Sequence, residues 1–113
     1  IWKKDQSKSE WACLHICQFT LSVNSLSWAP HQYGLMLAAA SSNGSLCIIH
    51  HKGDSWAENR YETAHHIGVN AISWKPVSVS GGKRQFVTGG CDKMVFLSFF
   101  LSFFCLSFFF AFF

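Results

Sequence analysis

The last twenty residues of the chain, Met94 to Phe113, contain no charged side chain. All nine Lys and Arg and all six Asp and Glu residues precede Met94, whereas ten of the twelve Phe residues follow Lys93. The net charge of +3 is therefore carried by residues 1–93, where the basic residues are scattered rather than clustered. This pattern favours an ordinary solvated surface over a nucleic-acid-binding face.

The cysteines lack the spacing of a disulfide framework. The five cysteines are odd in number and form no CxxC pair, which predicts free thiols and a reducing compartment. Trp11–Cys17 alternates and predicts a strand with Cys13, His15 and Cys17 on one face. Zinc sites commonly use four ligands in pairs closed by a turn, and the sequence shows neither a turn nor a fourth ligand here. We therefore interpret these residues as packed thiols beside a partly buried histidine, with a metal site as the alternative, and we expect no cofactor.

The chain begins at Ile1 and shows no charged-then-apolar leader. This predicts no signal peptide, and we interpret the sequence as a piece of a longer protein.

An internal repeat organises the chain. The segment SVNSLSWAP (Ser22–Pro30) returns 46 positions later as GVNAISWKP (Gly68–Pro76), with five identities in nine positions. Repeats of about 40–45 residues are typical of β-propeller blades, which have four strands each. We therefore predict an all-β partial propeller at residues 1–93, with repeats near residues 18–62 and 64–93.

Turn residues divide the first repeat into a complete blade. The predicted strands are Ser22–Ala29, Leu35–Ser41, Ser45–His50 and Trp56–Thr63. Asn43–Gly44 is the strongest hairpin signal. The second repeat supplies Gly68–Trp74 and Arg84–Gly90 before the tail, so we expect one full blade and parts of two neighbours. The predicted repeat core is Val23, Leu26, Trp28, Val69, Ile72 and Trp74.

The chain resembles the WD-repeat propellers, and among them the family of small propellers of the COPII outer coat, which also serves in the nuclear pore scaffold. The segments that carry the resemblance are Ile1–Trp11 (IWKKDQSKSEW), Ser22–Ser45 (SVNSLSWAPHQYGLMLAAASSNGS), Ala64–Pro76 (AHHIGVNAISWKP) and Lys83–Lys93 (KRQFVTGGCDK).

The resemblance implies a non-enzymatic scaffold in ER-to-Golgi protein transport and in the nuclear pore complex. The implied partners are an α-solenoid coat subunit, which adds a blade to an open ring by β-augmentation, and pore scaffold subunits. The implied location is the cytoplasmic face of the endoplasmic reticulum, COPII vesicles and nuclear pores, with peripheral membrane association through the coat. No nucleic acid or small molecule is implied as a partner.

The resemblance also implies a structural hydrogen-bonded set, which in WD repeats joins a His, a Ser or Thr, an Asp and a Trp. His65, Thr88 and Asp92 fit three of these places, whereas Ser98 stands where the Trp is expected. A hydroxyl–His–Asp set can also indicate a hydrolase, but the chain has no GxSxG nucleophile elbow. We therefore predict a structural role and no enzyme activity.

The tail admits three interpretations. Its twenty uncharged residues would, as a helix, span a bilayer core, and Lys83, Arg84 and Lys93 before it would favour a cytosolic N-terminal side. Phe, Leu and Ser, however, have pyrimidine-rich codons, and the family pattern stops just after Asp92. We interpret residues 94–113 as intron read-through or a gene-model artefact, with a helical membrane anchor or a core segment as alternatives. The alternative functions are a tail-anchored membrane protein displaying a WD fragment and a generic WD-repeat adaptor.

Overall fold

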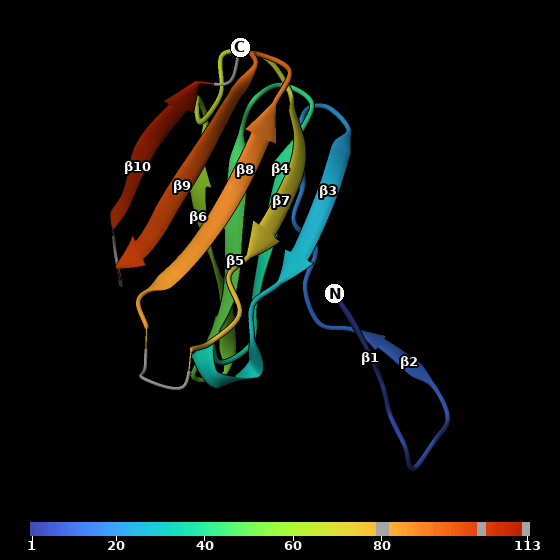
Figure 1. Cartoon of the computed structure of the whole chain (residues 1–113). Coiled ribbons are helices and arrows are strands. Elements are labelled where there is room, and N and C mark those ends of the chain that lie inside the picture. The colour runs from blue at the N-terminus through green and yellow to red at the C-terminus, as the bar shows by residue number, and fades with distance from the viewer. Residues whose placement is uncertain (79–81, 102–103, 112–113) are drawn as a thin grey trace.

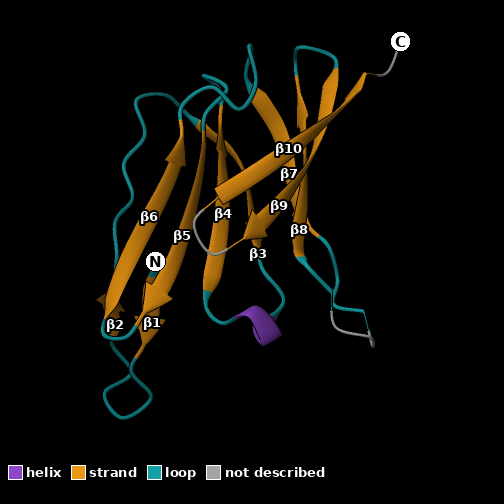
Figure 2. Ribbon diagram, turned by 90° about the vertical axis from the view of Figure 1, so that its left-hand side faces the viewer, coloured by secondary structure: helices purple, strands orange, loops and turns teal. Residues whose placement is uncertain are grey.

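The computed structural model describes residues 1–78, 82–101 and 104–111, with side chains described for residues 1–78 and 82–98. Two four-stranded antiparallel sheets lie side by side, and a two-stranded hairpin projects below them (Figures 1 and 2). The first sheet consists of β3 (Val23–Trp28), β4 (Met36–Ser41), β5 (Leu46–Lys52) and β6 (Ser55–Tyr61). The second consists of β7 (Val69–Trp74), β8 (Arg84–Gly90), β9 (Met94–Leu101) and β10 (Phe104–Ala111). The hairpin is formed by β1 (Trp2–Lys4) and β2 (Trp11–Cys13), and a single 3₁₀ turn, η1 (His31–Tyr33), joins β3 to β4.

The strands follow chain order across each sheet, as in propeller blades. The prediction of an all-β partial propeller is confirmed.

The sequence repeat is also a repeat of strand pairing. Val23 on β3 lies opposite Ser41, and the register shifts between Val23 and Ser25. In the second sheet Val69 lies opposite Gly90, and the register shifts at the matching place, between Val69 and Ala71. A bulge increases the local twist of a strand pair. The first strand of each sheet therefore begins with the same backbone distortion.

The predicted Asn43–Gly44 hairpin turn joins β4 to β5. Asn43 Oδ1 accepts hydrogen bonds from the Ser45 N–H (2.9 Å) and hydroxyl (2.6 Å). Gly44 has φ +89°, a conformation that favours glycine. A Cβ on Gly44 would collide with the carbonyl oxygen of His65, and the His65 N–H donates to Gly44 O at 3.0 Å. This turn of the first sheet therefore anchors the segment that enters the second.

The main core lies between the two sheets. The first sheet contributes small and aliphatic side chains, among them Ala38, Ala40 and Ile48, whose exposed fractions are all 0%. Against them pack Trp74 and Phe86, whose rings lie 5.1 Å apart. The alanines let β7 approach the first sheet closely, which dense packing requires.

Polar contacts tie β3 to β7 at this junction. The indole N–H of Trp74 donates to Ser27 O at 3.0 Å. The backbone N–H groups of Ile72 and Trp74 donate to the hydroxyls of Ser25 and Ser27, each at 3.3 Å. The serines at alternate positions of β3 therefore satisfy backbone donors of the neighbouring sheet.

The helical form considered for the tail is wrong, because the tail forms strands β9 and β10. β9 pairs with β8, with Phe96 opposite Thr88, and β10 pairs with β9 along its whole length. Phe, Val and Leu suit strands, and the edge of β8 offers unpaired backbone groups that a further strand satisfies. The second sheet, expected to end at its second strand, therefore has four. Within the described ranges of the chain, no helix has the length and apolar character to cross a membrane.

The strand predicted over Trp11–Cys17 is shorter than expected. It ends at Cys13, which pairs with Trp2, and the N–H groups of Leu14 and His15 then both turn to the carbonyl of Ile1. Residues 14–19 instead run along the outer face of the first sheet, where Cys17 and Phe19 pack against Leu37, Cys47 and Ile49.

Candidate functional site

The structure brings the three residues of the predicted hydrogen-bonded set together. The His65 ring lies in the turn before β7 and is 2% exposed. Its Nδ1 is 3.0 and 3.1 Å from the two carboxylate oxygens of Asp92, and its Nε2 is 2.9 Å from the hydroxyl of Thr88. When the ring is neutral, Nδ1–H donates to the carboxylate and Nε2 accepts from the hydroxyl, so both nitrogens are satisfied. Its role as a structural brace stays a prediction.

Asp92, between β8 and β9, accepts hydrogen bonds in two turns: the one before β7 and its own. Its carboxylate also accepts hydrogen bonds from the backbone N–H of His66 at 3.2 Å and of Met94 at 3.1 Å. Burial by itself raises its pKa, but the His65 hydrogen bond and these backbone donors outweigh that effect and hold the pKa of Asp92 below its ordinary value.

An aromatic side chain that the sequence pattern did not indicate completes the contacts of His65. Ser98, at the place expected for Trp, is 1% exposed. The Phe96 ring instead lies with its centroid 4.3 Å from that of His65, at an interplanar angle of 57°. On the remaining side, a Cβ on Gly90 would overlap the His65 ring and lie 2.6 Å from the Asp92 carboxylate. The His65 ring is therefore enclosed by Asp92, Thr88, Phe96 and Gly90.

The two sets of predicted core residues differ sharply in burial. Val69, Ile72 and Trp74 on β7 are 0%, 6% and 6% exposed. Their counterparts on β3 are Val23, Leu26 and Trp28, which are 40%, 60% and 52% exposed. β7 is buried because the first sheet covers it, whereas the described residues do not cover β3 in the same way. A core role for these three β3 residues stays a prediction that requires a further blade over this face.

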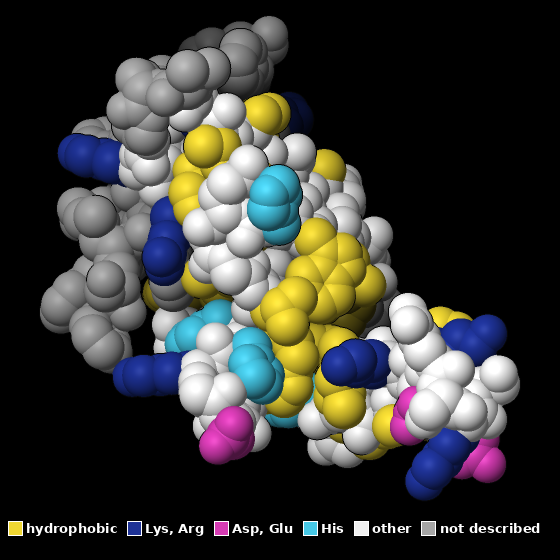
Figure 3. All heavy atoms as spheres, turned by 90° about the horizontal axis from the view of Figure 1, so that it is seen from below, with side chains coloured by type: hydrophobic (Ala, Val, Ile, Leu, Met, Phe, Trp, Pro, Cys, Tyr) yellow, Lys and Arg dark blue, Asp and Glu magenta, His cyan; other side chains and the backbone are white. Residues whose placement is uncertain are grey.

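The outer face of the first sheet, which residues 14–19 cross in part, carries two hollows. One, of about 210 Å³, is bordered by Leu26, Phe19 and Ala39, and another, of about 420 Å³, by Trp28 and Trp56. Seen from below, apolar side chains also gather beside the projecting hairpin (Figure 3). The face thus has the apolar character of a packing surface.

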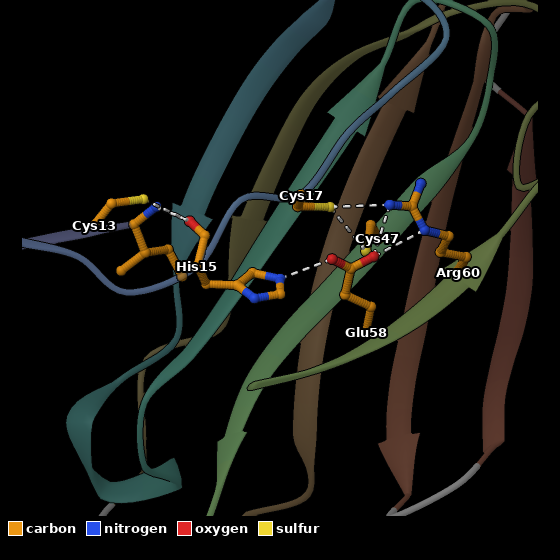
Figure 4. Close-up of polar contacts among 7 residues, drawn as sticks. Cys13, His15, Cys17, Cys47, Glu58 and Arg60 are labelled. Atoms are coloured by element: carbon orange, nitrogen blue, oxygen red, sulfur yellow. Dashed lines mark hydrogen bonds and ion pairs between the residues drawn. The ribbon is translucent and has the colours of Figure 1, made fainter. Parts of the chain in front are cut away.

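A second polar cluster lies where residues 14–19 cross β5 and β6 (Figure 4). Cys17 Sγ is 3.7 Å from Cys47 Sγ, and Glu58 accepts from His15 Nε2 at 2.7 Å and from Arg60 Nη2 at 2.6 Å. Arg60 Nη2 also donates to Cys17 Sγ at 3.3 Å.

The expected grouping of Cys13, His15 and Cys17 is therefore wrong. Cys13 is exposed and lies apart, with its Sγ 3.9 Å from His15 O, while Cys17 joins Cys47 and Glu58 from other strands. The only sequence signal for the true partners is alternation along β6, which places Glu58 and Arg60 on one face.

Charge and burial oppose each other in this cluster. Burial raises the pKa of the Cys47 thiol well above its ordinary range and raises the pKa of Cys17 as well. Burial also opposes ionisation of Glu58, but hydrogen bonds from Arg60 and His15 outweigh it and hold the pKa of Glu58 below its ordinary value. At neutral pH the cluster thus combines two neutral thiols with an ion pair.

Comparison with known proteins points to one kind of relative, although no family model matches the chain. "Protein transport protein SEC13" of Coccidioides immitis is 36% identical over 110 residues, which cover 84% of this chain and 36% of the relative. "Protein SEC13 homolog" of Drosophila melanogaster is 36% identical over 110 residues, covering 84% and 31%. "Protein transport protein SEC13" of Mycosarcoma maydis is 48% identical over 98 residues, covering 67% and 27%.

The chain spans about a third of the length of these relatives. Sequence identity, repeat spacing and blade topology agree, and the chain belongs to the Sec13-like WD-repeat propellers, of which it represents a part.

Proposed function

We propose that this chain is part of a non-enzymatic scaffold of the COPII vesicle coat, acting in protein transport from the endoplasmic reticulum to the Golgi. The observation that carries the proposal is its identity of 36% and 48% to two relatives named "Protein transport protein SEC13". Two sheets with blade topology and an uncovered apolar face support a packing role.

The enclosed state of His65 supports the non-enzymatic part of the proposal. A catalytic histidine must exchange a proton with a reacting group within hydrogen-bond reach. His65 is 2% exposed, and Thr88, whose hydroxyl bonds to its Nε2, is 1% exposed, so a substrate reaches neither group. This arrangement suits a brace between turns rather than a hydrolase.

The proposed partners are an α-solenoid coat subunit and, at a second location, nuclear pore scaffold subunits. The corresponding locations are the cytoplasmic face of the endoplasmic reticulum with its COPII vesicles, and the nuclear pore complex. In such an assembly the face of β3 with Leu26 and Trp28 would be covered by a neighbouring blade, as β7 is covered here.

For the chain's organisation, we propose that residues 1–93 carry the propeller sequence, with repeats near residues 18–62 and 64–93. We further propose that residues 94–113 are intron read-through or a gene-model artefact. An antibody against Trp56–Lys75 would capture the endogenous protein for mass spectrometry. Ordinary WD sequence after Lys93 supports the proposal for the tail, and recovery of the Phe-rich peptide refutes it.

Affinity purification tests the scaffold proposal. The tagged chain is expressed in cells, and the co-purifying α-solenoid coat and pore subunits are quantified separately. Trp28→Ser, on the uncovered face, should reduce their recovery, whereas Ile67→Ser, at a similarly exposed apolar residue (57%), should not. Recovery of neither class of subunit would contradict the proposal, and recovery of pore subunits alone would contradict its coat assignment.

A further inference from the structure

We propose that Cys17, Cys47 and Glu58 form a binding site for a zinc ion, with His15 as the fourth donor. These residues come from three different segments: Cys17 from the stretch after β2, Cys47 from β5 and Glu58 from β6 (Figure 4). One ligand atom of each lies within 4.8 Å of the others. Thiolate and imidazole with a carboxylate form a donor set that zinc accepts.

The spacing of the two sulfur atoms fits the ion. Two thiolates bound about 2.3 Å from a tetrahedral zinc ion lie roughly 3.8 Å apart. Cys17 Sγ and Cys47 Sγ are 3.7 Å apart, which is close to this value and far longer than a disulfide bond of about 2.05 Å. The sulfur atoms therefore need little movement to bind zinc.

His15 already points at the same carboxylate. Its Nε2 is 2.7 Å from Glu58 Oε1, and its side chain is only 19% exposed. On zinc binding, the imidazole would carry its proton on Nδ1, so that Nε2 is free to bind the ion. The hollow of about 210 Å³ is bordered by two of the four proposed donors, His15 and Cys17.

Arg60 explains how so much negative charge can be accommodated. Two thiolates and one carboxylate carry three negative charges, which a divalent ion and the Arg60 guanidinium neutralise together. Arg60 Nη2 lies 3.3 Å from Cys17 Sγ and 2.6 Å from Glu58 Oε2, the position of an outer group that donates to ligand atoms.

Zinc binds thiolates rather than thiols, so binding must release the proton of any thiol ligand that is protonated. Zinc affinity should therefore fall as the pH is lowered.

Cobalt(II) in place of zinc provides a spectroscopic test on the reduced, full chain. A tetrahedral site with two thiolates gives intense visible d–d bands and a sulfur-to-cobalt charge-transfer band. We expect these bands to saturate at one equivalent and to disappear when zinc is added. Cys17→Ser should abolish the charge-transfer signature, and His15→Gln should weaken zinc binding.

Cys13→Ser is the matched control, because Cys13 is exposed and lies outside the cluster. Cys17 lies outside regular strands, so its substitution should leave the sheets intact, and the spectrum of the unsubstituted chain is a test that needs no variant. The proposal is overturned if cobalt gives no tetrahedral bands or if Cys13→Ser has the same effect as Cys17→Ser. It is equally overturned if Cys17 and Cys47 are joined by a disulfide in the reduced preparation.

Discussion

Gly90 offers a sharp test of the bracing role of His65. A Cβ at this position of β8 would collide with the His65 ring and lie 2.6 Å from Asp92 Oδ1. The ring cannot turn aside freely, because it is bonded on both edges and packs on Phe96. Gly90→Ala must therefore break the bond between His65 and Asp92 or displace the strand.

The cost follows from these two alternatives. Loss of a hydrogen bond to a charged group costs about 1.5–3 kcal/mol, and overpacking costs about 1–3 kcal/mol. Replacing glycine within a strand returns about 0.5–1 kcal/mol. We expect Gly90→Ala to lower the free energy of unfolding by about 1–2 kcal/mol.

Gly89→Ala is the matched control. It lies one residue earlier on β8, and a Cβ there meets no atom within 4 Å. This variant should be neutral or slightly stabilising. Urea unfolding followed by tryptophan fluorescence reports on Trp74, which is buried between the sheets. For a slope of about 2 kcal/mol per molar urea, the midpoint of Gly90→Ala should fall by roughly 0.5–1 M. Equal midpoints for the two variants would refute the bracing role.

Three further substitutions test other parts of the same framework. Thr88→Val keeps the side-chain shape but leaves His65 Nε2 buried without its hydrogen-bond partner. It should lower the free energy of unfolding, measured in urea, by about 1–3 kcal/mol. Thr88→Ser keeps the hydroxyl and should lower it by less. The pKa of Asp92 is lowered in the folded chain, so its contribution to stability is present above its ordinary pKa and is lost as the pH falls through the lowered value. Asp92→Asn should therefore flatten the dependence of the free energy of unfolding on pH in the acidic range. An unchanged pH dependence would contradict this. Trp74→Phe removes the indole donor to Ser27 O between the sheets and should lower stability by about 1–3 kcal/mol, whereas Trp28→Phe, at the exposed counterpart, should change it by less than about 1 kcal/mol.

Local chemistry was enough to predict the first blade and the first two strands of the second. The recurrence of Trp28 and Pro30 at Trp74 and Pro76 reveals the repeat, and alternating polarity with an Asn43–Gly44 turn sets the strand boundaries. These signals are readable because strand period and turn preference depend on neighbouring residues. The same information, with the family resemblance, predicted that Thr88 and Asp92 meet His65, but it did not predict Phe96.

Tertiary structure decided what surrounds those elements. The repeated Trp is exposed on β3 as Trp28 and buried on β7 as Trp74, because burial depends on which sheet lies opposite. The sequence repeat carries no information about that neighbouring sheet. The tail forms strands rather than a helix because the edge of β8 offers it backbone partners. Cys17 meets Cys47 and Glu58 across 30 and 41 positions of sequence, a convergence that only the crossing of residues 14–19 over β5 and β6 creates.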